Sequence, residues 1–169
     1  MEEFVLSPPS AVLYLAGAIV IVAIASIFLK KGEALRKAIG VGIVLVVAVA
    51  LVIFLYRPTA ITVSPDGVEV DGAGGLELAW DEVESAVYEP DLSSSPYRPT
   101  VRTRGVAVGP YRTGRFLLSN GDPARVFMEQ SESAVVMRTS ELTYVFAPAD
   151  VQGLATAVDT YRVYEGDAQ

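Results

Sequence analysis

Two long apolar runs dominate the first third of the chain. Residues 11–29 and residues 38–56 are each 19 residues long and contain no charged side chain. At ~1.5 Å per residue, a helix of this length covers about 28 Å, close to the ~30 Å hydrocarbon thickness of a bilayer. Only residues 30–37 connect the runs. The pattern therefore predicts a hairpin of two transmembrane helices within residues 1–57.

Basic residues predict how this hairpin is oriented. The connector contains four of them, whereas none precedes the first run and only Arg57 directly follows the second. Lysine and arginine near helix ends favour the cytoplasmic side. We therefore expect a multi-pass protein of the cell membrane, with a cytoplasmic connector and with the N-terminus and residues 58–169 outside the cytoplasm.

Small residues recur within both apolar runs. They let helix backbones approach closely, and a spacing of four residues is typical of such contacts. The candidate packing positions are Gly17, Ala38, Gly40 and Gly42. The pattern leaves open whether these residues pack within the hairpin or between copies of the chain.

After residue 58 the hydrophobic period changes from that of a helix to that of a strand. Apolar and polar residues alternate in 61–63 and 68–70 around Ser64-Pro65-Asp66-Gly67, which predicts a hairpin. Asn120-Gly121 is a second hairpin signal. Further strands are expected at 76–80, 83–88, 114–119, 124–128, 134–138 and 142–146. Trp80 is expected to anchor the core.

The C-terminal segment has a helical pattern instead. Pro148 suits a first helical turn, and Asp150 lies where the helix dipole favours an anion. One face of the expected helix is apolar and comprises Val151, Leu154, Ala155, Val158 and Tyr161. One amphipathic helix, ending near Gly166, is therefore expected to close a domain over residues 58–169.

Composition excludes several functional classes. The chain has no histidine and no cysteine, which removes the usual general base and nucleophile pairs and the commonest metal ligands. Residues 57–169 contain nine arginines and seventeen carboxylates. An acidic domain is a poor partner for nucleic acid or anionic lipid, which select positive charge. We expect no enzyme, no cofactor and no metal.

Five arginines fall within eighteen residues of the acidic domain. These are Arg98, Arg102, Arg104, Arg112 and Arg115. Guanidinium groups pair with carboxylates in two-bond arrangements, so the cluster is a candidate site for an acidic partner. The alternative is that these arginines neutralise the domain's own carboxylates. Arg102 and Arg104 share a face if the segment is a regular strand.

Asp81, Glu82 and Glu84 form a carboxylate cluster directly after Trp80. Their spacing is not the alternating pattern of a calcium-binding loop. They are expected to cap a turn after Trp80 and not to form a metal site.

The order of strands and final helix, together with Leu78-Ala79-Trp80-Asp81-Glu82-Val83 and the run from Pro110 to Gly121, resembles the bacterial pleckstrin-homology-like (PH-like) domain family. The resemblance covers about residues 60–164. It implies a bent β-sandwich or barrel plugged by the last helix, in proteins that commonly carry membrane helices and act in binding or assembly. Pleckstrin domains that bind phosphoinositides have a basic first hairpin loop. Residues 64–67 are not basic, so phosphoinositide binding is not expected.

Together these patterns predict an α+β protein, in which a transmembrane hairpin precedes an antiparallel PH-like β-sandwich or barrel capped by one C-terminal helix. The expected function is non-enzymatic contact between proteins, or self-assembly, at a membrane surface. The expected partners are the lipid bilayer and either a second copy of the chain, forming a homo-oligomer, or another membrane protein. The alternatives are a small accessory subunit of a larger membrane complex and a carboxylate-dependent hydrolase.

Overall fold

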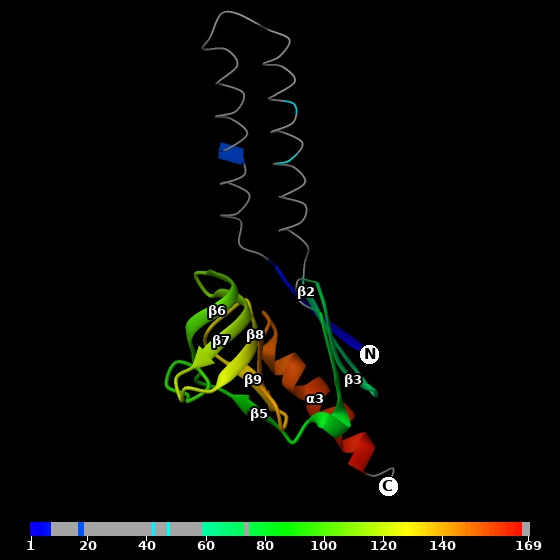
Figure 1. Ribbon diagram of the computed structural model, residues 1–169. Helices are drawn as coiled ribbons and strands as arrows, with labels where there is room; N and C mark the ends of the chain where they lie inside the picture. The colour runs from blue at the N-terminus through cyan, green and yellow to red at the C-terminus, as the bar shows by residue number, and fades with distance from the viewer. Residues whose placement is uncertain (8–16, 19–41, 43–46, 48–58, 73–74, 167–169) are drawn as a thin grey trace, which may run out of the picture. The chain divides into compact units, whose positions relative to one another are not determined.

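The computed structural model describes residues 1–7, 59–72 and 75–166, together with the single positions 17, 18, 42 and 47. The chain divides into two units, Met1–Ser7 with Pro58–Gln169, and Pro8–Arg57. All the described strands and the helix α3 belong to the first unit, where they form two sheets and one helix (Figure 1).

The first sheet has four antiparallel strands in chain order. They are β1 (Glu2–Leu6), β2 (Thr59–Ser64), β3 (Gly67–Asp71) and β4 (Leu76–Ala79). Ser64 pairs with Gly67 at the β2–β3 turn, which confirms the predicted hairpin. Ile61 and Val63 are fully buried, whereas Thr62 between them is only partly buried. The alternation therefore separates an inner face of this sheet from an outer one.

Strand β1 was not predicted from the sequence. Residues 2–6 lie before the first apolar run, but they pair antiparallel with β2, with Phe4 opposite Ile61. Leu6 is fully buried. The N-terminal residues are thus part of the β-domain and not only a flank of residues 11–29.

The second sheet has six strands in the order β5-β9-β10-β8-β7-β6. A short 3-10 helix, η1 (Trp80–Glu82), connects the two sheets. The strands are β5 (Ser85–Glu89), β6 (Pro99–Val108), β7 (Tyr111–Leu118), β8 (Pro123–Met128), β9 (Ala134–Arg138) and β10 (Thr143–Ala147). All pairs are antiparallel except β8 with β10, so the expected purely antiparallel arrangement is wrong at this position. β6 and β5 form the two edges.

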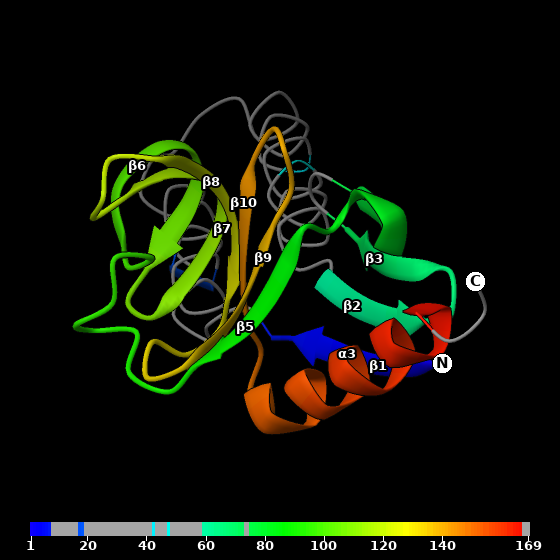
Figure 2. The same ribbon diagram turned by 90° about the horizontal axis from the view of Figure 1, so that it is seen from below.

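Helix α3 (Val151–Gly166) contacts β2 of the first sheet and β5 and β9 of the second. It lies at the opening between the sheets (Figure 2). Asp150 accepts a hydrogen bond at Oδ1 from the Gly153 backbone N–H at 2.8 Å, as an N-cap does. Val151, Leu154 and Val158 are buried. The predicted C-terminal helix and its apolar face are confirmed.

Trp80 is 4% exposed. Its indole N–H donates to the Ser64 carbonyl at 2.9 Å, so it packs in the core and also fixes the β2–β3 turn. This agrees with the role expected for it.

The predicted fold class and localisation need correction. In the part of the chain that the structure describes, no helix is long and apolar enough to cross a membrane, and the single long helix is α3 at the C-terminus. The helices predicted at 11–29 and 38–56 lie outside the described residues, apart from four positions in helical conformation. An uncharged run in the sequence shows only that the segment is apolar, whereas a membrane span also requires a continuous helix. The same finding overturns the predicted multi-pass topology with an extracytoplasmic domain.

Candidate functional site

The basic residues of the domain are concentrated in one segment. Residues 92–121 contain five arginines and neither lysine, aspartate nor glutamate, a net charge of +5. The whole chain carries −7. Most of this segment is the β6–β7 hairpin, and every residue from Thr100 to Pro110 is exposed. Positive charge is therefore gathered on an exposed edge of an otherwise acidic protein.

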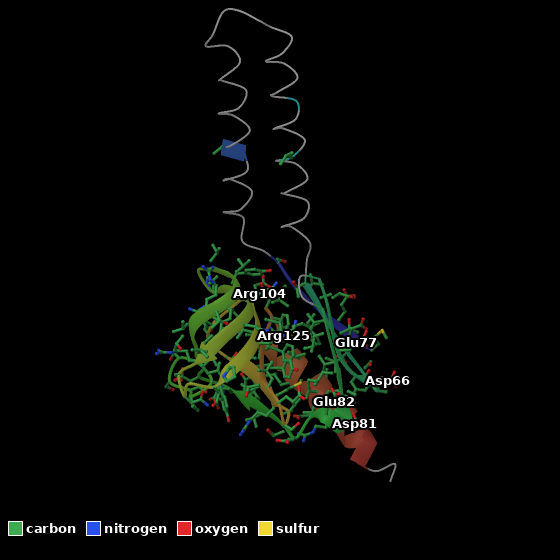
Figure 3. The ribbon with its side chains drawn as sticks, viewed as in Figure 1. Asp66, Glu77, Asp81, Glu82, Arg104 and Arg125 are labelled. Atoms are coloured by element: carbon green, nitrogen blue, oxygen red, sulfur yellow. The ribbon has the colours of Figure 1, made fainter. Side chains whose placement is uncertain are left out.

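Three arginines lie side by side on this part of the second sheet. Arg104 on β6 pairs with Arg115 on β7, and Arg115 pairs with Arg125 on β8. Directly opposite residues of neighbouring strands share a face, with Cβ atoms about 4.5–5.5 Å apart. Arg104 and Arg115 are exposed and Arg125 is half-buried. We call these three residues the arginine row; Figure 3 labels its two ends.

Two glycines shape the hairpin beside the row. Gly105 faces Gly114 across β6 and β7, next to the pair formed by Arg104 and Arg115. Their φ angles are +117° and +123°, values that side chains with a Cβ rarely adopt. A Cβ on Gly114 would collide with the Arg104 carbonyl oxygen. The close approach of the two strands therefore requires glycine at this position.

Irregular pairing separates Arg102 from Arg104. Arg102 pairs with Phe116, whereas Arg104 pairs with Arg115, so the register shifts by one residue between them. Phe116 and Arg115 are successive residues of β7 and point to opposite faces. The expectation that Arg102 and Arg104 share a face is therefore wrong. Thr103 lies at the shift, and its hydroxyl donates to the Arg115 carbonyl at 3.0 Å.

Arg125 is the anchored end of the row. Its guanidinium carbon lies 5.4 Å from the centroid of the Phe127 ring, and Phe127 stacks on Phe146 at 5.6 Å. Nη2 also donates to the Gly75 carbonyl at 3.4 Å. Burial lowers the pKa of Arg125 from its ordinary value, nearby Tyr144 raises it and Arg115 lowers it. The group stays cationic at neutral pH, because arginine loses its proton only far above pH 7.

The exposed part of the row has no internal counter-charge. Within the described residues, neither Arg104 nor Arg115 forms an ion pair. Like charges directly opposite on neighbouring strands destabilise a sheet. No ion pair among the described residues therefore supports neutralisation of the domain's own carboxylates, the alternative raised by the sequence, at these two side chains.

Arg98 and Arg112 have a different role. The Nη1 atom of Arg98 donates to the Ser93 carbonyl at 3.2 Å, and that of Arg112 donates to the Pro99 carbonyl at 2.7 Å. Both side chains line a cavity of about 400 Å³ beside the loop before β6. Two of the five predicted arginines thus donate hydrogen bonds to backbone carbonyls. The predicted cluster therefore does not form one surface.

Sequence reasoning missed Arg125, although a signal for it was present. The hairpin signal at Asn120-Gly121 makes the strands that carry Arg115 and Arg125 neighbours, and the observed loop of residues 119–121 pairs the two arginines directly. The segment considered from the sequence ended at Arg115 and excluded the third member of the row.

Carboxylates gather at a separate cleft of about 310 Å³. It is lined by Leu78, Asp81, Glu82, Glu84, Thr139, Ser140, Glu141 and Tyr144. All four acidic side chains are exposed. No group of three potential ligands among the described residues could hold a metal ion. Burial raises the pKa of Tyr144, Arg125 lowers it, and Glu82 raises it. Tyr144, which is opposite Arg125, therefore separates the arginine row from this acidic rim.

The predicted helix-packing residues are untested. Ala38 and Gly40 lie outside the described residues, and Gly17 and Gly42 are described only as single helical positions.

Comparison with known proteins gives one match. A family model described as a bacterial PH domain matches residues 89–161, from the end of β5 into α3, and this segment includes the whole arginine row. No curated protein and no solved structure matches the chain. The predicted resemblance is therefore confirmed as a PH-like domain over this segment, while the first sheet lies outside the match.

Proposed function

We propose that this protein is a non-enzymatic interaction module whose arginine row binds an acidic segment of a protein partner. The observation that carries the proposal is the cross-strand series of Arg104, Arg115 and Arg125. The exposed cations Arg104 and Arg115, directly opposite each other, repel in the free protein. Carboxylates of a partner would remove this repulsion and would pair with guanidinium groups in two-bond geometry.

The site is partly preorganised for such a partner. Arg125 is fixed by its contact with Phe127 and by its hydrogen bond to Gly75. The backbone that carries Arg104 and Arg115 is paired between β6 and β7. Side chains that are already ordered lose less conformational entropy on binding. The row thus combines one rigid cation with two exposed cations that reach solvent.

Catalysis receives less support from the same structure. Acid–base chemistry by carboxylates relies on burial or like-charge pairing to tune one of them. The carboxylates of the acidic cleft, Asp81, Glu82, Glu84 and Glu141, are all exposed to solvent. The chain also lacks histidine and cysteine. A binding role therefore explains more of the observations than a hydrolase does.

The test measures binding of a fluorescein-labelled peptide of alternating glutamate and threonine to the full chain by fluorescence anisotropy. A nonionic detergent covers the apolar runs at 11–29 and 38–56 without screening charge. The double variant Arg104→Glu/Arg115→Glu is expected to bind at least about tenfold more weakly, because two ion pairs of ~0.7 kcal/mol each amount to ~1.4 kcal/mol.

Arg138→Glu is the matched control. Arg138 is also an exposed strand arginine, but it lies on β9 outside the row. We expect the control to bind nearly as tightly as the native chain, and the native affinity to fall with added salt. Equal affinity of the double variant and the native chain would refute the proposed role of the row.

A further inference from the structure

The outer face of the first sheet carries a second charged series, of opposite sign. The cross-strand register runs from Glu3 on β1 through Thr62 on β2 to Glu69 on β3 and Glu77 on β4. All three glutamates are exposed. We call Glu3, Glu69 and Glu77 the acidic row. Figure 3 shows Glu77 on the first sheet, apart from Arg104 on the second.

The sheet pattern fixes the acidic row on the solvent side. Phe4, Ile61 and Val70 are the chain neighbours of Glu3, Thr62 and Glu69, and they lie on the opposite face. Ile61 and Val70 are buried, and Phe4 packs against the same core. A partner can therefore reach the acidic row without opening the domain.

We propose that the arginine row binds the acidic row of a second copy of this chain, so that copies associate head to tail. This inference rests on the proposed function and names its partner. It is carried by charge complementarity, and the spacing of Glu69 and Glu77 agrees with that of Arg104 and Arg115.

Within each row, charges on directly neighbouring strands are about 4.8 Å apart, whereas Thr62 on β2 lies between Glu3 and Glu69. Glu69 and Glu77 are directly paired, as are Arg104 and Arg115. An isolated extended peptide presents same-face side chains every second residue, at about 6.7 Å. A sheet that carries its own cross-strand row of carboxylates therefore matches the arginine row more closely than a single strand does.

Both rows also contain like charges directly opposite each other, which is unfavourable in the isolated chain. Docking one row on the other relieves the repulsion in both. Because each copy carries a net charge of −7, orientations that bring two acidic surfaces together are repulsive. Charge thus selects the orientation that brings the basic segment, residues 92–121, to the acidic row.

The two surfaces are different, so the contact is heterologous. In a pair of copies, one copy therefore keeps its acidic row free and the other keeps its arginine row free. Heterologous contacts build rings where the rotation closes and open chains where it does not. The inference therefore predicts assemblies that grow beyond a dimer as concentration rises.

Disulfide cross-linking tests the contact directly, because the native chain contains no cysteine. Val106 lies two residues after Arg104 on β6, and Asp71 lies two residues after Glu69 on β3. Both are exposed and lie on the faces of their respective rows. The full-length variants Val106→Cys and Asp71→Cys are mixed at low salt in nonionic detergent and oxidised.

We expect crossed dimers in the mixture at least tenfold in excess of dimers from either variant alone. Ser94→Cys replaces Val106→Cys in the control mixture, since Ser94 is exposed in a loop away from both rows. The crossed product is expected to be lost in 0.5 M NaCl. Similar yields in the control mixture and the test mixture would overturn the inference.

Charge exchange provides the second arm. Charge reversal of either row in both cysteine variants is expected to abolish the crossed dimer. The two reversals are Arg104→Glu/Arg115→Glu and Glu69→Lys/Glu77→Lys. All four substitutions placed together in both partners are expected to restore it. Trp80 fluorescence verifies that each variant is folded. Failure of the fourfold variant to restore cross-linking, with folding intact, would contradict the proposed pairing.

The two proposals can fail separately. If the acidic peptide binds the arginine row but no crossed dimer forms, the proposed function stands and the second copy is not the partner. If neither binding nor cross-linking occurs, both proposals are refuted.

Discussion

Replacing Arg115 by glutamate is predicted to stabilise the domain while removing the proposed binding surface. Arg115 is the middle member of the arginine row, opposite both Arg104 and Arg125. In the native chain both cross-strand contacts bring like charges together. In Arg115→Glu both become pairs of opposite charge, so one substitution changes the sign of two interactions.

The size of this gain follows from the geometry. A cross-strand pair of opposite charges contributes ~0.2–1 kcal/mol, and a like-charge pair is unfavourable. Arg104 and Arg115 are exposed, which places their contact at the lower end. We expect the free energy of unfolding to rise by about 0.5–1 kcal/mol in all. For a chain of this size, 1 kcal/mol corresponds to roughly 2–4 °C in Tm.

Urea unfolding followed by Trp80 fluorescence measures the change. Trp80 is the single tryptophan and is buried, so its emission reports loss of the core. The gain is expected in 20 mM salt and should disappear in 1 M NaCl, where the Debye length falls to about 3 Å. Arg138→Glu is the control, because the cross-strand neighbours of Arg138 are the uncharged Thr143 and Ser85.

A stabilising change that removes binding would indicate that the native row is kept for recognition and not for folding. The reasoning would be refuted if Arg115→Glu were no more stable than the native chain at low salt. A gain of equal size in 1 M NaCl would also refute it, because an electrostatic origin requires screening.

Two further predictions concern the core and its titration. Trp80→Phe removes the indole N–H that donates to the Ser64 carbonyl and is expected to lower the free energy of unfolding by about 1–2 kcal/mol. Urea unfolding followed by far-ultraviolet circular dichroism measures this loss, and native stability in the variant would contradict it. Burial raises the pKa of Tyr144 above its ordinary 10.0, so the unfolded chain ionises first and stability falls as pH rises above about 10. Tyr144→Phe is expected to flatten this fall between pH 9 and 11, and an unchanged slope in thermal unfolding would count against the prediction.

Local signals in the sequence predicted much of the fold. The turn residues 64–67 specify the β2–β3 hairpin because their conformations close a tight turn. Asn120-Gly121 indicates the β7–β8 hairpin in the same way, although a two-residue turn there would pair Arg115 with Val126 and not with Arg125, as observed. The apolar face of α3 follows from the helical period. In each case the residues that determine the structure are close together in the chain.

Pairings between distant segments could not be predicted in this way. β1 pairs with β2 across more than fifty residues, and no turn sets that register. The parallel pair of β8 and β10 is likewise set by packing, since β9 lies between them in the chain. Uncharged runs at 11–29 and 38–56 were interpreted through length and apolarity alone, and the described residues contain no membrane-spanning helix.

The arginine row depends on a feature that periodicity cannot reveal. Continuing the register of the Arg102 and Phe116 pair without a shift would place Arg104 opposite Gly114 instead of Arg115. One extra residue in β6 therefore creates the first pair of the row. β-bulges re-aim side chains and are common near functional sites. A bulge that brings two exposed arginines together gives up regular pairing and adds charge repulsion, so folding alone does not explain it. The proposed binding of an acidic surface would offset this cost, because the carboxylates of a partner would neutralise the paired arginines.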